Sequence, residues 1–280
     1  MITRFDHAVI GVQNIEIAIE SFSDLGFEIF EGGRHPMLGT RNAIVRFGLD
    51  YLELLGVENE LQARQSGPFG SELVDFLSQG SGLVGFVLAS DGLDQEAKRM
   101  QKKEIQYSGP FAMDRKKPDG TSVAWRLVVP GSSPWRKPWP FIIEWQTDDK
   151  ARMKLESAGI HSNECEKVLG MDLLVGDLVL ARQFYEEGLG LKTSCASTDK
   201  ITKNSSVVYE VGDFSLNVKL PSNEEEELEL ENLGPGPYRL LLGSKALPDS
   251  FRYNGKDENL RLFEFDVITA LGARMVLVLD

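Results

Sequence analysis

The 280-residue sequence has few of the side chains on which much protein chemistry depends, with only two cysteines and three histidines. The cysteines, Cys165 and Cys195, are too few for a disulfide framework and lack the C-x-x-C spacing of zinc or redox sites. The histidines are His7, His35 and His161, so any histidine-dependent chemistry is limited to very few arrangements. We expect neither thiol to have a dedicated role.

Long apolar runs and an excess of positive charge are also lacking. No apolar stretch approaches the ~20 residues that a membrane-spanning helix needs, and the first residues do not resemble a secretory signal. The 43 acidic residues outnumber the 30 lysines and arginines, and the resulting net charge of -13 disfavours phosphate backbones and anionic lipids as partners. We expect a cytoplasmic protein that binds neither nucleic acid nor membranes.

The motifs of P-loop nucleotide binding, zinc proteolysis and serine hydrolysis are not found, since the sequence has no G-x-x-x-x-G-K-[ST], H-E-x-x-H or G-x-S-x-G. What the chain does have is an ordinary globular composition, with 42% hydrophobic and 26% charged residues. Its length suggests one or two domains with a conventional core. Fold and function therefore have to come from the patterning of the sequence.

The hydrophobic pattern repeats along the first half of the chain. The first copy is expected to have a strand at 5–12, a helix that begins after Asn14, and strands at 27–31, 42–47 and 51–57. A polar loop at 58–82 follows. The second copy is expected to have a strand at 83–89, a helix at 93–103, and strands at 105–111, 122–129 and 141–145. The order of each copy is β-α-β-β-β, which indicates an internal repeat.

A third copy is expected from a strand at 172–175, a helix at 179–187 and strands at 192–196, 206–211 and 214–220. The acidic stretch 224–231 is interpreted as a solvated linker, and strands follow at 238–242, 260–265 and 275–279 with no helix between them. The predicted fold is therefore α+β, with four tandem βαβββ modules of which the last is degenerate. We expect one module pair at 1–150 and a second pair at 166–280.

Several of these segments resemble the vicinal oxygen chelate superfamily, which includes glyoxalase I, extradiol dioxygenases and bleomycin-binding proteins. They are D-H-A-V-I-G-V, L-G-F, Y-L-E-L and the later A-R-Q-F-Y-E-E-G-L-G-L. The segments G-G-R-H-P, G-T-R-N-A and P-F-I-I-E-W are similar to a glyoxalase-like domain of bacterial proteins. The resemblance implies two βαβββ modules that form a curved sheet around a divalent metal, with ligands from the first and last strand of each module.

This resemblance makes His7, on the first strand, a candidate metal ligand, together with Glu53 and Glu144 on the last strands of the first two modules. The metal would be Zn, Mn, Fe or Ni, and Glu53 and Glu144 are also the candidate catalytic carboxylates. A satisfied core histidine and outward-facing glutamates are the alternatives, since strand residues alternate between faces. The opening strand of the second module, from Leu83 to Phe86, offers no donor, so a metal held weakly or not at all stays open.

Five further residues are candidate contacts for a substrate. Arg34, His35 and Asn42 lie on the loop and the strand edge between the second and third strands, where glycines permit tight turns. Trp125 belongs to a run of aromatic residues that suits a small-molecule pocket, and Arg126 is expected to pair with a carboxylate, either that of a substrate or that of Glu144. We expect His161 to be an exposed loop residue.

Three functions stay open in this interpretation. The first is a glyoxalase-like lyase, isomerase or dioxygenase that acts through a divalent metal on a small substrate with vicinal oxygens. The second is a metal-free protein that binds or sequesters a small molecule, as bleomycin-binding relatives do. The third is an interaction or regulatory module with a relict pocket. The second module pair is expected to lack a metal site, because the positions that match His7 and Glu53 lie near Gly170 and Asn217. We expect it to be a structural partner, and a homodimer stays open.

Overall fold

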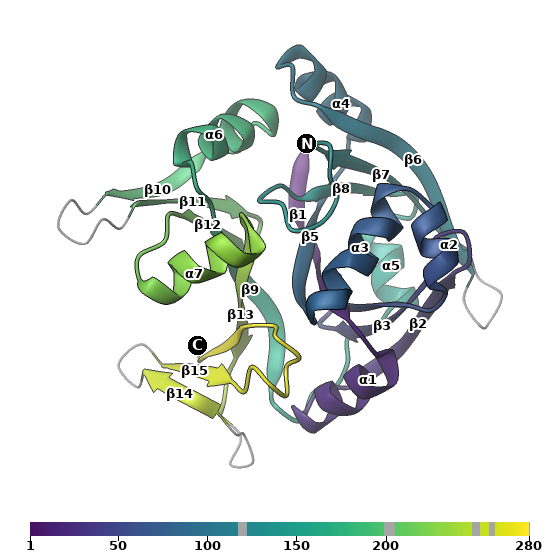
Figure 1. Ribbon diagram of the computed structural model, residues 1–280, viewed down its shortest axis with the longest axis vertical. Coiled ribbons are helices and arrows are strands. Elements are labelled where there is room, and N and C mark those ends of the chain that lie inside the picture. The colour runs from purple at the N-terminus through teal and green to yellow at the C-terminus, as the bar shows by residue number, and fades with distance from the viewer. Residues whose placement is uncertain (117–121, 199–204, 248–252, 258–260, 280) are drawn as a thin grey trace.

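The computed structural model describes residues 1–116, 122–198, 205–247, 253–257 and 261–279. It contains two eight-stranded mixed sheets, with the strand orders β2-β3-β4-β1-β5-β8-β7-β6 and β10-β11-β12-β9-β13-β16-β15-β14 (Figure 1). The predicted α+β fold of tandem βαβββ modules is confirmed. Among the described residues, no helix is both long enough and apolar enough to cross a membrane.

The first sheet is built from two modules related by the same strand order. The first module consists of β1 (Ile2–Val12), α1 (Ile15–Asp24), β2 (Ile29–His35), β3 (Thr40–Arg46) and β4 (Tyr51–Val57). The second consists of β5 (Gly82–Ser90), α4 (Leu93–Lys102), β6 (Tyr107–Lys116), β7 (Ser122–Pro130) and β8 (Phe141–Trp145). The two modules meet where β1 pairs with β5 in antiparallel fashion, while β4 and β8 lie parallel to β1 and β5.

The second sheet repeats this plan after α5 (Asp149–Leu155). The third module consists of β9 (Cys165–Leu174), α6 (Leu178–Arg182), the π-helical turn η1 (Gln183–Gly188), β10 (Thr193–Thr198), β11 (Ser205–Val211) and β12 (Phe214–Lys219). The fourth consists of β13 (Gly236–Ser244), β14 (Tyr253–Asp257), β15 (Leu262–Phe265) and β16 (Met275–Leu279). No helix is found between β13 and β14 among the described residues, as the degenerate fourth module predicts.

Two segments expected to be irregular are helical. The presumed polar loop contains α2 (Glu60–Gln65) and α3 (Pro68–Gln79), and α3 places Leu73 and Leu77 against the apolar face of β1 and β5. The presumed acidic linker is α7 (Glu224–Leu233), whose first turn is capped by the Asn223 side chain. Four glutamates at the start of α7 interact favourably with the helix dipole, which explains why an acidic run forms a helix here.

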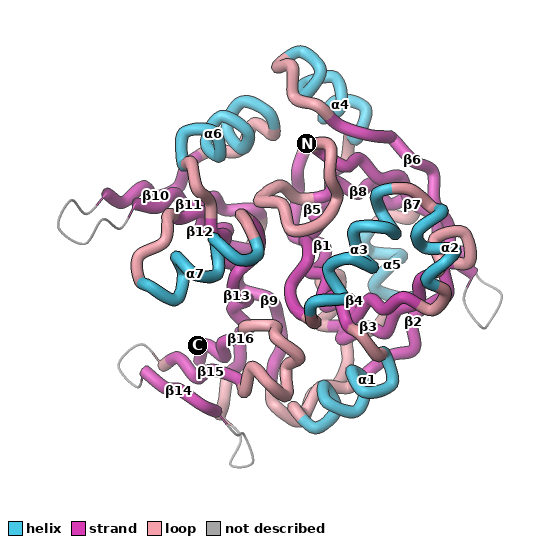
Figure 2. Tube along the Cα trace, in the orientation of Figure 1, coloured by secondary structure: helices cyan, strands magenta, loops and turns pink. Residues whose placement is uncertain are grey.

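The two sheets lie side by side (Figure 2). They share one hydrophobic core that contains residues of both. Phe5 on β1 stacks on Phe214 on β12, with ring centroids 4.3 Å apart. Because strand residues alternate between faces, Ala8 and Ile10 enter this shared core, while Val9 faces the opposite side of the first sheet. That opposite face is partly covered by α3 and carries the cavity described next.

Candidate functional site

A cavity lies on the face of the first sheet that points away from the second sheet. Its volume is about 700 Å³ with its mouth included. The strands contribute alternate residues, so β8 provides Phe141, Ile143 and Trp145, and β7 provides Trp125 and Leu127. Phe69 from α3 and Trp135 from the loop after β7 complete the wall, and the Trp135 indole N–H donates to the Phe69 carbonyl at 2.6 Å.

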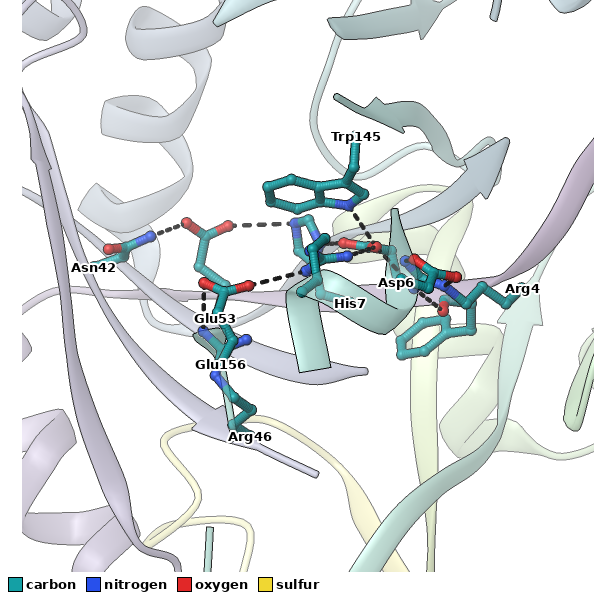
Figure 3. Close-up of polar contacts among 11 residues, drawn as sticks. Arg4, Asp6, His7, Asn42, Arg46, Glu53, Trp145 and Glu156 are labelled. Carbon is teal, nitrogen blue, oxygen red and sulfur yellow. Dashed lines mark hydrogen bonds and ion pairs between the residues drawn. The ribbon is translucent and has the colours of Figure 1, made fainter. Parts of the chain in front are cut away.

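The polar end of the cavity is formed by His7, Glu53 and Asn42, which come from three neighbouring strands (Figure 3). The Asn42 amide donates a hydrogen bond to Oε1 of Glu53, and its own oxygen accepts the Gly33 N–H at 2.6 Å. Oε2 of Glu53 lies 3.6 Å from Nε2 of His7. The His7 ring stacks on Tyr51, with centroids 4.4 Å apart. Both the imidazole and the carboxylate are thus held in fixed orientations at one end of an aromatic chamber.

His7 is oriented from behind by Asp6, which is fully buried. Oδ1 of Asp6 lies 2.8 Å from Nδ1 of His7, while Oδ2 accepts the Trp145 indole N–H at 2.8 Å and pairs with Arg4 at 2.9 Å (Figure 3). Burial alone would raise the pKa of Asp6, but the His7 hydrogen bond and the neighbouring positive charges hold this pKa well below its usual range. The carboxylate therefore accepts the Nδ1 proton and leaves Nε2 of His7 to face the cavity.

The strand register shows which residues of the second module correspond to His7 and Glu53. His7 on β1 pairs with Tyr51 on β4, and Glu53 is two residues further along. In the second module Val87 on β5 pairs with Phe141 on β8, so Ile143 corresponds to Glu53. Val87 and Ile143 both line the cavity. The first module therefore contributes the polar side chains of His7 and Glu53 to the site. The equivalent positions of the second module carry a valine and an isoleucine.

Glu144 and Arg126 lie on the other face of the sheet, which corrects the expectation that they join the site. The Glu144 carboxylate accepts the Leu93 N–H at 3.2 Å and the Arg126 Nε–H at 2.8 Å, and Arg126 also contacts Asp94 at 3.1 Å. A shift of one residue along a strand reverses the face, so Ile143 rather than Glu144 enters the cavity. Arg126 therefore binds Glu144, which was the second of the two partners expected for it.

Arg34 is also outside the cavity, because its 68% exposed side chain pairs with Glu58. His35 does line the cavity, and its Nδ1 lies 3.0 Å from the hydroxyl of Thr40. His161 was expected to be exposed but is buried, between the Glu28 N–H and the Arg46 carbonyl. Of the residues singled out from sequence, the structure brings together His7, His35, Asn42, Glu53 and Trp125.

Sequence reasoning missed Asp6, Tyr51 and Phe69. Asp6 carried a usable signal, since a carboxylate inside an apolar strand must find partners when it is buried. Phe69 carried none, because it reaches the cavity only through the packing of α3 on the sheet. In the second sheet the same register places Gly170 opposite Ser215 and leaves Asn217 at the position of Glu53, in agreement with the sequence interpretation.

A divalent metal fits this donor set poorly. Two donors bound at about 2.1 Å in tetrahedral geometry are about 3.4 Å apart, so the 3.6 Å between His7 and Glu53 matches a pair of ligands. No third donor joins them, since the described residues contain no group of three His, Cys, Asp or Glu side chains able to share an ion. The predicted ligand set of His7, Glu53 and Glu144 is therefore not assembled.

Comparisons with known proteins agree with this architecture. A model of the glyoxalase-like domain family matches residues 5–189. A hypothetical protein from Staphylococcus aureus has a similar structure, with a TM-score of 0.74, 14% identity and 99% of both chains covered. A variant of 4-hydroxymandelate synthase from Streptomyces coelicolor gives a TM-score of 0.58 at 13% identity, with 88% of this chain and 72% of that chain covered.

A fusion of a xylose isomerase-like TIM barrel with a 4-hydroxyphenylpyruvate dioxygenase gives a TM-score of 0.52 at 14% identity, with 88% of this chain and 37% of that chain covered. A search of curated protein sequences gives no significant match. Identities this low show a shared fold alone.

Proposed function

The chain belongs to the glyoxalase-like domain family, within the vicinal oxygen chelate superfamily, and we propose that its first module pair binds a small, mainly aromatic molecule without the help of a metal. The apolar body of the ligand lies among Trp125, Trp135 and Phe141, and its polar group meets Glu53 and Asn42. A chamber with apolar walls and a few converging polar groups is the usual form of a small-molecule site.

The observation that supports this proposal is the pairing of a polar half-site with an apolar one. At the two positions where the superfamily places ligands on the second module, Val87 and Ile143 offer only methyl groups. These side chains bury apolar ligand surface, which contributes roughly 25 cal/mol for each Å² removed from water. The same side chains contribute nothing to the coordination of a metal.

A second candidate is an enzyme in which Glu53 moves a proton on the bound molecule. The observation in its favour is the buttressing of His7 by Asp6, which fixes the imidazole 3.6 Å from the Glu53 carboxylate. A carboxylate in an apolar chamber, next to an oriented imidazole, is suited to general acid–base work on a small carbonyl or hydroxyl compound. Glu53 would then be the general acid–base group of a lyase or isomerase reaction.

Binding of aromatic compounds to the purified protein in excess chelator tests the proposal. Trp125, Trp135 and Trp145 line the cavity, so quenching of tryptophan fluorescence reports occupancy. We expect saturable quenching that is unaffected by chelator and is reduced in Trp125→Leu. Turnover of a bound compound that is lost in Glu53→Gln would favour the enzyme instead. Quenching that requires an added divalent metal would contradict the proposal.

A further inference from the structure

We propose that the cavity selects ligands in which a positively charged nitrogen is attached to the aromatic or apolar body. This inference rests on the proposed binding function and adds the charge of the ligand. It follows from the charge balance of the chamber and from the arrangement of its aromatic rings.

The charge balance of the cavity is negative. Among the described residues that line it, Glu53 is the one carboxylate, and no lysine or arginine is present. The Glu53 carboxylate accepts a hydrogen bond from the neutral Asn42 amide, and Nε2 of His7 lies 3.6 Å from it, beyond the range of a good hydrogen bond. The Glu53 side chain is only 14% exposed, so little water compensates it. An ammonium group at this end would supply the missing counter-charge, whereas a carboxylate or phosphate would be repelled.

The arginines around the cavity are engaged with acids. Arg46 lies 5.2 Å from the ring of Tyr51 and pairs with Glu156. Arg126 is bound by Glu144 and Asp94 on the opposite face of the sheet, and Arg34 pairs with Glu58 at the surface. Behind His7, Arg4 pairs with both Asp6 and Asp149. These pairs leave Glu53 as the carboxylate available to a ligand cation, in contrast to the anion-binding arginines that the sequence suggested.

The aromatic rings of the cavity are arranged as walls set at angles to one another. The Trp125 and Trp145 rings have centroids 5.3 Å apart and an interplanar angle of 46°. Trp135 and Phe141 are 5.2 Å apart at 55°, and Phe69 lies 4.7 Å from Trp135. Ring faces attract cations through their quadrupole, and boxes of several aromatic residues are a common solution for quaternary ammonium ligands.

The protein already uses one of these faces for a cation. The guanidinium of Arg152 lies 3.7 Å from the ring centroid of Trp145, and Arg152 is itself paired with Glu156 and Asp6 beneath the cavity. One face of Trp145 is therefore already taken, and a ligand meets the faces of the other rings of the wall. Glu53 supplies the counter-charge for the ligand cation, while Trp125 and the rings beside it contact the apolar body to which the cation is attached.

Three phenylethyl compounds of different charge, of which the cation and the neutral one are isosteric, separate charge from apolar contact. They are (2-phenylethyl)trimethylammonium, its neutral carbon isostere (3,3-dimethylbutyl)benzene, and 3-phenylpropanoate, each titrated into the full chain by calorimetry in excess chelator. We expect the cation to bind at least about tenfold more tightly than the neutral isostere, which is about 1.4 kcal/mol, and the anion to bind most weakly. Glu53→Gln should remove this tenfold preference by weakening the binding of the cation.

Glu144→Gln is the matched control, because it removes a carboxylate from the opposite face of the same sheet. It should keep the preference for the cation. Trp125→Leu, which does not alter the charge, should weaken the binding of both the cation and the neutral isostere and keep the preference for the cation. If Glu53→Gln fails to fold, the comparison of the three ligands on the wild type still tests the inference. Equal binding of cation and neutral isostere, or tightest binding of the anion, would overturn this inference and leave the binding function standing. Failure of all three ligands would overturn both.

Discussion

Val87 lies directly opposite His7 across the antiparallel pairing of β1 and β5. The two residues occupy equivalent positions in two modules of the same plan, and both face the cavity. One position carries an imidazole that is oriented by a buried carboxylate, and the other carries an isopropyl group. At this position the second module therefore lacks the polar side chain that a symmetric metal site would need. The result is a chamber with one polar end.

Introducing a metal-binding side chain at Val87 should create a metal site in this fold. In Val87→His a second imidazole would lie beside His7 and Glu53, giving three donors. We expect Zn²⁺ or Ni²⁺ at a hundredfold excess over its dissociation constant to raise the free energy of unfolding of this variant by about 2.7 kcal/mol. Thermal unfolding with and without metal measures the effect. The wild type should respond much less, and the double variant with His7→Ala should lose the gain.

Asp6→Asn should destabilise the protein in a pH-dependent way. The pKa of Asp6 is lowered by folding, so its charged form contributes stability that is complete well above its ordinary value of 3.8 and is lost as the pH falls through the folded value. Removing one partner of a buried ion pair costs about 3–5 kcal/mol. We expect a loss of that order at pH 7, measured by urea unfolding, and a smaller difference between variant and wild type near pH 3. An equal difference at both pH values would contradict the assignment.

Glu53 and Glu144 show which parts of the fold and of the site the sequence predicts. Both were recognised as carboxylates on the last strand of a module, and the strands themselves were predicted nearly to the residue. Their faces were not, because an apolar run on a buried strand has no alternation that would distinguish Ile143 from Glu144. The register between β5 and β8, which decides this point, is set by tertiary packing.

The α2–α3 segment shows a second limit of sequence reasoning. Its serines, glycines and glutamines are typical of a loop, yet Leu73 and Leu77 lie one turn apart on α3 and pack on the sheet. Two leucines separated by three residues are too few for hydrophobic periodicity to be decisive over a short helix. The cavity wall contributed by Phe69 depends on this packing and was therefore beyond prediction.

Leu73→Ala tests whether α3 is anchored as described. Leu73 is fully buried against the cavity side of the sheet, and truncation of such a side chain costs about 2–5 kcal/mol. We expect a loss of this size in chemical denaturation, together with weaker ligand binding because Phe69 loses its support. Leu61→Ala on α2 is the control, since Leu61 is 70% exposed and its truncation should change stability by less than about 0.5 kcal/mol. Similar losses in the two variants would show that α3 does not depend on Leu73.

His161 should make the protein sensitive to mild acid. Nδ1 of His161 accepts the Glu28 N–H at 3.0 Å and Nε2 lies 3.1 Å from the Arg46 carbonyl, so the buried ring is neutral. Burial lowers the pKa of His161 below its ordinary value of 6.5. Its contribution to stability is therefore complete above pH 6.5 and is lost as the pH falls through the folded value. Urea unfolding between pH 7 and pH 5 should show a decline that is shallower in His161→Gln; an equally steep decline would refute this role.

The most direct test of the central claim is a titration of wild-type protein with a soluble aromatic ligand, (2-phenylethyl)trimethylammonium, followed by tryptophan fluorescence with and without chelator. We expect saturable binding with one dissociation constant in both conditions, because the walls around Trp125 and the Glu53 carboxylate are complete without a metal. Binding that disappears in chelator and returns when a divalent metal is added would contradict the claim.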